Sequence, residues 1–251
     1  MSLFAVVVLH EYGLPIYKKF KRGEERPMEP LIAAILGLAK EVGLGDVAHA
    51  TFERASLIVL RGISERKLLL SLLVRRVDHN SYLWGIYLLS KLEKAIGDLP
   101  DVVTDDIIDT AKSIIDKYFD KLPKIPDFLG ESFLAAAEKY GPLFYSSLMV
   151  LLYRKFGTDP LVTLVRDPPK FIREIDKILG RESVDQLGMY TFIYLCETYK
   201  DVCTILGVQD VRAMAKELLK ALRKTPRREA LKKFRDLIEK IIDTFLSQSS
   251  S

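Results

Sequence analysis

The residue types that most often carry chemistry are few and widely separated in this 251-residue chain. Its three histidines, His10, His49 and His79, lie far apart in the sequence, and neither cysteine lies near them. A zinc site needs several His, Cys or carboxylate ligands, usually at close spacing. We therefore expect no metal site from the histidines unless the fold brings all three together.

Five aspartates near residue 100 form a second candidate for metal binding. Spacings of three and four residues place several carboxylates on one side of a helix, which is a geometry that suits a hard cation. The same residues lie where a helix is expected to begin, and acidic side chains there interact favourably with the helix dipole. We favour this second interpretation and expect no bound metal. The five are Asp98, Asp101, Asp105, Asp106 and Asp109.

The two cysteines, Cys196 and Cys203, lie in an apolar segment that predicts one helix over residues 184–206. Seven residues of helix would separate them by about 10 Å on one face, which is too far for a disulfide. We expect them to be packing residues rather than nucleophiles. Because two cysteines make no disulfide framework, a cytoplasmic location is the default, and a bridge between two chains stays open.

No motif of a known catalytic mechanism is present. A phosphate-binding loop and a nucleophile elbow are both absent. The sequence Gly43-Leu44-Gly45 has Ala48 in place of the third glycine of a dinucleotide-binding turn, and His10-Glu11 has Leu14 in place of the second histidine of a zinc-protease helix. We expect a non-enzymatic protein with no catalytic residues and no cofactor. An enzyme of unrecognised type is the alternative.

The first 97 residues predict strands and helices in a mixed order. Gly13 separates two β-rich segments and predicts a hairpin, and three further extended segments predict a meander. One helix begins at prolines, and another begins with capping residues at 78–81 and ends at Gly97. The expected strands are 3–9, 14–17, 48–53, 56–61 and 67–75, and the helix between the second and third strands is 27–42.

This order, ββαβββα, resembles the profilin-like core of longin and roadblock domains. The resemblance rests on the opening strands FAVVVLHEYGLPIYKKF, the paired strands HATFERASLIVLRG and the passage LLLSLLVRRVDHNSYLWGIYLLSKLEKAI. It implies a five-stranded sheet, protein partners that are often small Ras-like GTPases, and frequent dimerisation. In that fold residues 48–53 would be an edge strand, so we expect self-association there, with Ala48, Ala50 and Phe52 as candidate contact residues.

From residue 104 onward the apolar period is helical and predicts seven or eight short helices. Asp159-Pro160 and Asp167-Pro168 are interpreted as helix caps followed by a proline in the first turn, rather than as a ligand loop. The fold class is therefore α+β, with an N-terminal sheet domain followed by an all-α domain. The expected divisions are the α/β domain 1–97, an acidic connecting helix and loop 98–131, a helical domain 132–246 and a disordered tail 247–251.

The longest uncharged run, residues 140–153, is shorter than the roughly 20 residues that span a bilayer. It predicts a core helix, and we expect no transmembrane segment. The opening apolar run 3–9 lacks the basic residues that precede it in a signal peptide, which agrees with a cytoplasmic location. One asparagine and three glutamines in the whole chain are typical of a thermophilic protein.

The formal net charge of +4 conceals an uneven distribution. Residues 98–131 carry 4 Lys+Arg against 9 Asp+Glu, and residues 205–246 carry 11 against 6. The bases are either the solvated face of two amphipathic helices or a surface for acidic protein, anionic lipid or nucleic acid. The candidate partner-binding residues are Lys220, Arg223, Lys224, Arg227, Arg228 and Lys232.

These patterns predict a regulatory or scaffolding protein that acts through protein contacts, with a homodimer formed by its N-terminal domain. The alternative is a protein that binds nucleic acid or an anionic membrane surface through its basic C-terminal helices. The acidic segment 98–131 is a further candidate partner for those helices, within the same chain.

Overall fold

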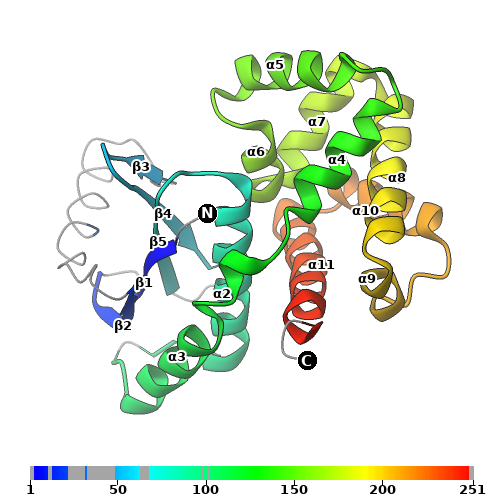
Figure 1. Cartoon of the computed structure of the whole chain (residues 1–251). Helices are drawn as coiled ribbons and strands as arrows, with labels where there is room; N and C mark the ends of the chain where they lie inside the picture. Colours follow the sequence, from blue (N-terminus) through cyan, green and yellow to red (C-terminus); the bar gives the residue numbers. More distant parts are fainter. Residues whose placement is uncertain are drawn as a thin grey trace. The chain divides into compact units, whose positions relative to one another are not determined.

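The computed structural model describes residues 3–10, 13–21, 32, 49–62, 68–97, 99–100 and 102–248. Within these residues the fold is α+β, with a five-stranded antiparallel sheet in the N-terminal region and helices after it (Figure 1). The chain divides into two compact units, Met1–Lys124 and Ile125–Ser251. We name them the sheet unit and the helical unit.

The sheet consists of a hairpin and a three-stranded meander, as the sequence predicts. Its strands are β1 (Leu3–His10), β2 (Pro15–Phe20), β3 (His49–Thr51), β4 (Ser56–Arg61) and β5 (Leu68–Val74). They lie in the order β2-β1-β5-β4-β3, with every neighbouring pair antiparallel. Gly13 has a φ of 84°, which suits glycine, in the turn between β1 and β2.

Both faces of the sheet are covered by apolar side chains. Val7 and Leu9 of β1 lie in a buried cluster with Ile32 on one face, together with residues of β4 and β5. The expected helix 27–42 lies outside the described residues except for Ile32, which is fully buried in that cluster. Because side chains alternate along a strand, the intervening residues of β4, such as Leu60, point to the opposite face.

Helix α2 (His79–Ile96) packs on that opposite face (Figure 1). The carboxylate of Asp78 caps the helix and accepts a hydrogen bond from the Ser81 backbone N–H at 2.8 Å. A Cβ atom at Gly85 would collide with the side chains of Leu60 and Leu72, so glycine lets α2 lie close to β4 and β5. The predicted end of the helix at Gly97 is confirmed.

Helix α3 (Asp105–Tyr118) packs on α2 and on β2. The Tyr17 hydroxyl donates to Asp116 Oδ1 at 3.0 Å, and Lys19 Nζ lies 2.8 Å from the same oxygen. The hydrogen bond from Lys19 lowers the pKa of Asp116. The sheet unit extends through the short 3-10 helix η1 (Leu122–Lys124), so most of the acidic segment 98–131 belongs to this unit.

The helical unit contains eight α-helices within the described residues. They are α4 (Phe128–Glu138), α5 (Phe144–Phe156), α6 (Pro160–Arg166), α7 (Pro168–Leu179), α8 (Arg181–Thr198), α9 (Lys200–Ile205), α10 (Val211–Lys224) and α11 (Arg227–Gln248). Asp159 caps α6 and Asp167 caps α7, each followed by proline, as predicted. Helix α11 continues through Ser247 and Gln248, which we expected to lie in a disordered tail, and residues 249–251 lie outside the described part.

The prediction of one helix over residues 184–206 is wrong. The chain turns at Tyr199, between α8 and α9, and this turn brings the Cα atoms of Cys196 and Cys203 to 5.4 Å, where the two residues form a disulfide. A continuous helix would hold them about 10 Å apart. The Tyr199 hydroxyl donates to Glu131 Oε2 at 2.6 Å, and its ring packs on Phe245 with centroids 5.1 Å apart, so contacts with α4 and α11 hold the turn.

The prediction of a core helix from the uncharged run 140–153 is also wrong. Only Leu148 and Leu152 of α5 are fully buried. Helix α5 contacts α4 and α6, and Phe156 near its end stacks on Phe171 of α7 with ring centroids 6.0 Å apart. None of the described helices is both long enough and apolar enough to cross a membrane.

Candidate interaction surfaces

Helix α5 presents large apolar side chains to solvent. Leu143 is 74% exposed, Val150 52%, Leu151 49% and Tyr153 57%. Residues separated by seven and eight positions share a helix face, and Tyr153 lies next to Val150 at a spacing of three. We call these four residues the α5 patch. Apolar side chains gathered on one surface commonly mark a site that binds another molecule.

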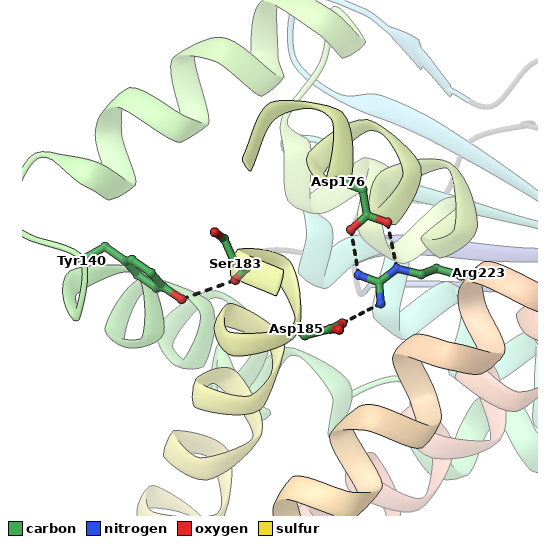
Figure 2. A network of polar contacts seen from close by, with 5 residues as sticks. All are labelled: Tyr140, Asp176, Ser183, Asp185 and Arg223. Atoms are coloured by element: carbon green, nitrogen blue, oxygen red, sulfur yellow. Dashed lines mark hydrogen bonds and ion pairs between the residues drawn. The ribbon is translucent and has the colours of Figure 1, made fainter. Parts of the chain in front are cut away.

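The start of α5, next to the α5 patch, is held in place by contacts of Tyr140. Tyr140, just before α5, stacks on Phe144 with ring centroids 4.8 Å apart. Figure 2 shows its hydroxyl directed at α8, where it donates to the Ser183 carbonyl oxygen at 3.3 Å. Burial raises the pKa of Tyr140. These contacts tie the start of α5 to α8.

Sequence reasoning missed the α5 patch because it took an uncharged run for a buried one. One signal was present: the helix carries apolar residues all round and no acidic residue, and Arg154 and Lys155 are the charged residues that follow the run. A helix that is apolar on all sides is stable only where other groups pack on every side of it, so any side that its own chain leaves uncovered indicates a surface for a partner.

The six basic residues predicted to bind a partner differ in their exposure to solvent. Arg223 is half-buried, whereas the others are exposed. Its guanidinium donates from Nε and Nη2 to the two carboxylate oxygens of Asp176, each at 2.7 Å, and from Nη1 to Asp185 at 2.5 Å (Figure 2). The hydrogen bonds to Asp176 raise the pKa of Arg223. Arg223 therefore joins α7, α8 and α10 and is not open to a partner.

The remaining basic residues lie on the exposed sides of α10 and α11. Arg227 Nη2 contacts Asp167 Oδ2 at 3.0 Å while its side chain stays 67% exposed. The carboxylates that pair with Arg223 and Arg227 come from α7, α8 and the α6–α7 junction. Five of the six candidate partner-binding residues are therefore exposed: Lys220, Lys224, Arg227, Arg228 and Lys232.

Strand β3 is at one edge of the five described strands. It is only three residues long, and it ends where the Phe52 N–H donates to the Ala55 carbonyl oxygen at 2.8 Å. Ala50 is half-buried and Phe52 is 42% exposed, whereas Ala48 lies outside the described residues. Two of the three candidate contact residues are thus placed at this edge.

The histidines take structural positions in the sheet unit. His10 is fully buried on β1, and His79 is buried at the start of α2. His49 Nδ1 lies 3.1 Å from the Tyr82 hydroxyl. Asp105, Asp106 and Asp109 are exposed at the start of α3, and Asp98 and Asp101 lie outside the described residues. In the part of the chain that the structure describes, no group of three His, Cys, Asp or Glu side chains is arranged to hold a metal ion.

Comparison with known proteins gives no information on the function of this chain, so the function is inferred from the surfaces described above. Neither a protein-family model, nor a curated protein, nor a solved structure matches the chain.

Proposed function

We propose that this chain is a non-enzymatic regulatory or scaffolding protein that acts through contacts with other proteins. The single observation that carries the proposal is the α5 patch, where Leu143 and Tyr153 are more than half exposed on a helix that is anchored at its start. Exposed apolar side chains cost solubility, and they are retained where a partner covers them.

A small Ras-like GTPase is the partner class to test first. This choice rests on the resemblance of residues 1–97 to longin and roadblock domains, and the five-stranded sheet followed by α2 supports that resemblance. The sheet unit would supply the self-association that the resemblance implies, and the α5 patch would supply a separate surface on the helical unit.

The test is binding of the purified full chain to the small GTPases of its host, each loaded with GDP or with a non-hydrolysable GTP analogue. We expect at least one GTPase to bind, with one nucleotide state preferred. The substitution Val150→Asp should weaken that binding at least tenfold, because it places a charge in the centre of the apolar contact.

Ile205→Asp is the matched control, since Ile205 is 61% exposed on α9 and lies outside the α5 patch. Absence of binding by every GTPase in both nucleotide states would contradict this partner class. Equal binding by Val150→Asp and the unsubstituted chain would instead contradict the role of the α5 patch.

The exposed basic residues on α10 and α11, which include five of the six candidates, favour a second candidate function, which is binding of nucleic acid or of an anionic membrane surface. Reversing the charge of Lys220, Lys224, Arg228 and Lys232 should abolish salt-sensitive binding to either. Arg223 is left intact because its loss would disturb the packing of α7, α8 and α10. Reversal of four exposed lysines elsewhere, Lys112, Lys139, Lys170 and Lys200, is the control.

A further inference from the structure

The helical unit contains a partly open apolar cavity of about 100 Å³. Its walls come from α4, α6, α7, α8, α10 and α11, and no charged side chain is among them. The polar side chains in the lining are Ser132 and Thr191. An apolar cavity of this kind does not hold ordered water, which needs several polar partners.

Ser132 is the unusual member of the lining. It is 1% exposed on α4, and its hydroxyl has no hydrogen-bond partner among the described residues. Three threonines inside helices of the same unit hydrogen-bond to the backbone of their own helix. Thr191, Thr204 and Thr244 each donate to the carbonyl oxygen four residues earlier, at 2.8, 3.1 and 2.9 Å. Ser132 makes no such bond.

A buried hydroxyl without a partner destabilises the protein that carries it, so a hydroxyl in an apolar wall indicates a group that binds there. We propose that the cavity binds a small neutral apolar molecule that carries one hydroxyl group, such as a phenol or a short alcohol. Ser132 supplies the hydrogen bond, and the apolar walls supply the rest of the affinity. The absence of charge in the lining disfavours carboxylates and amines, because their charges would be buried without a counter-ion.

Several residues that line the cavity are not fully buried. Phe192 of α8, Leu218 of α10 and Leu237 of α11 are half-buried, whereas Phe128, Phe171 and Leu187 are buried. For size, an engineered cavity of about 150 Å³ takes up benzene. A single ring fits here if half-buried side chains such as Leu218 and Leu237 move slightly outward.

The test compares two probes of one shape, phenol and benzene, which differ by a hydroxyl. Isothermal titration calorimetry with the full chain should show that both bind and that phenol binds more tightly. Ser132→Ala should reduce the preference for phenol over benzene by about threefold to tenfold, which corresponds to one hydrogen bond, and leave benzene binding nearly unchanged.

Ser132→Leu provides the second variant, because its side chain fills the cavity and should abolish binding of both probes. Failure of the unsubstituted chain to bind either probe overturns the proposal, and so does a phenol preference that survives in Ser132→Ala. If Ser132→Leu does not fold, the comparison with Ser132→Ala still decides. The α5 patch is not part of the cavity, so these outcomes are independent of the proposed protein contacts.

Discussion

Arg223 on α10 donates two parallel hydrogen bonds to the carboxylate of Asp176 on α7, both 2.7 Å long. The Arg223 side chain is 10% exposed, and its third contact, with Asp185, reaches α8. Three helices that are separate in the sequence are thus joined at one planar group. Only arginine offers donors in this fork arrangement, because the lysine ammonium is a single point charge.

Replacing Arg223 by lysine should therefore lower the free energy of unfolding by about 2 kcal/mol, because charge-assisted hydrogen bonds are lost from a mostly buried site. Urea unfolding followed by circular dichroism measures the change. Lys224→Ala is the control, since Lys224 is exposed next to Arg223 and should change stability by less than about 0.5 kcal/mol. A stable Arg223→Lys variant would show that the pair is incidental.

Tyr17 should make the protein less stable in alkaline solution. Burial and the hydrogen bond to Asp116 raise the pKa of Tyr17 to about 12, from an ordinary value of 10.0. Between these values the unfolded chain has lost a proton that the folded chain keeps. The stabilising contribution is therefore complete below pH 10 and is lost as the pH rises towards 12.

Tyr17→Phe should flatten this alkaline loss, which urea unfolding at a series of pH values from 9 to 11.5 detects. Tyr153→Phe, at an exposed tyrosine of the α5 patch, is the control and should leave the slope as it is. An unchanged slope in Tyr17→Phe would show that other groups cause the loss.

Reduction of the Cys196–Cys203 disulfide should destabilise the junction of α8 and α9. The bond closes a short loop, with a sequence separation of 7, and closure of a loop of this size is worth about 2 kcal/mol in the chain-entropy description. Dithiothreitol should lower the Tm of the unsubstituted chain and leave the Tm of a Cys196→Ser, Cys203→Ser variant unchanged. Titration of the denatured, unreduced protein should find no free thiol; two thiols would contradict the bond.

The edge strand β3 should mediate self-association. Phe52→Lys places a charge beside this edge and should shift the protein from dimer to monomer, because a lysine at a strand edge opposes pairing with a second chain. Light scattering at high micromolar concentration measures the mass. Leu14→Lys is the control, as Leu14 is 54% exposed in the turn between β1 and β2. A mass of 28.6 kDa for the unsubstituted chain would contradict the prediction.

Local patterns were enough to predict most elements of this fold. Two apolar, β-rich runs on either side of Gly13 predicted the β1–β2 hairpin, and Asp-Pro pairs predicted the starts of α6 and α7. Such features depend on a few neighbouring residues, because turns, caps and strand alternation are decided by backbone geometry and nearby hydrogen bonds.

The sites depended on contacts between distant residues, and sequence reasoning failed there. In the sequence Arg223 cannot be distinguished from its exposed basic neighbours, because its partners Asp176 and Asp185 come from α7 and α8. The apolar run in α5 looked like core, but Leu148 and Leu152 are the only residues of this helix that are fully buried, and the α5 patch is exposed to solvent. Burial is a property of what surrounds a side chain, and no local pattern encodes it.

The sequence by itself determined the α+β class, the hairpin and the meander of the sheet, and the absence of familiar catalytic motifs. The tertiary structure decided that Cys196 meets Cys203 across the turn at Tyr199, that Arg223 is a packing residue, and that Ser132 faces an apolar cavity. The physical reason is the range of the interactions: element formation is local, whereas pairing and burial require segments far apart in the chain to meet.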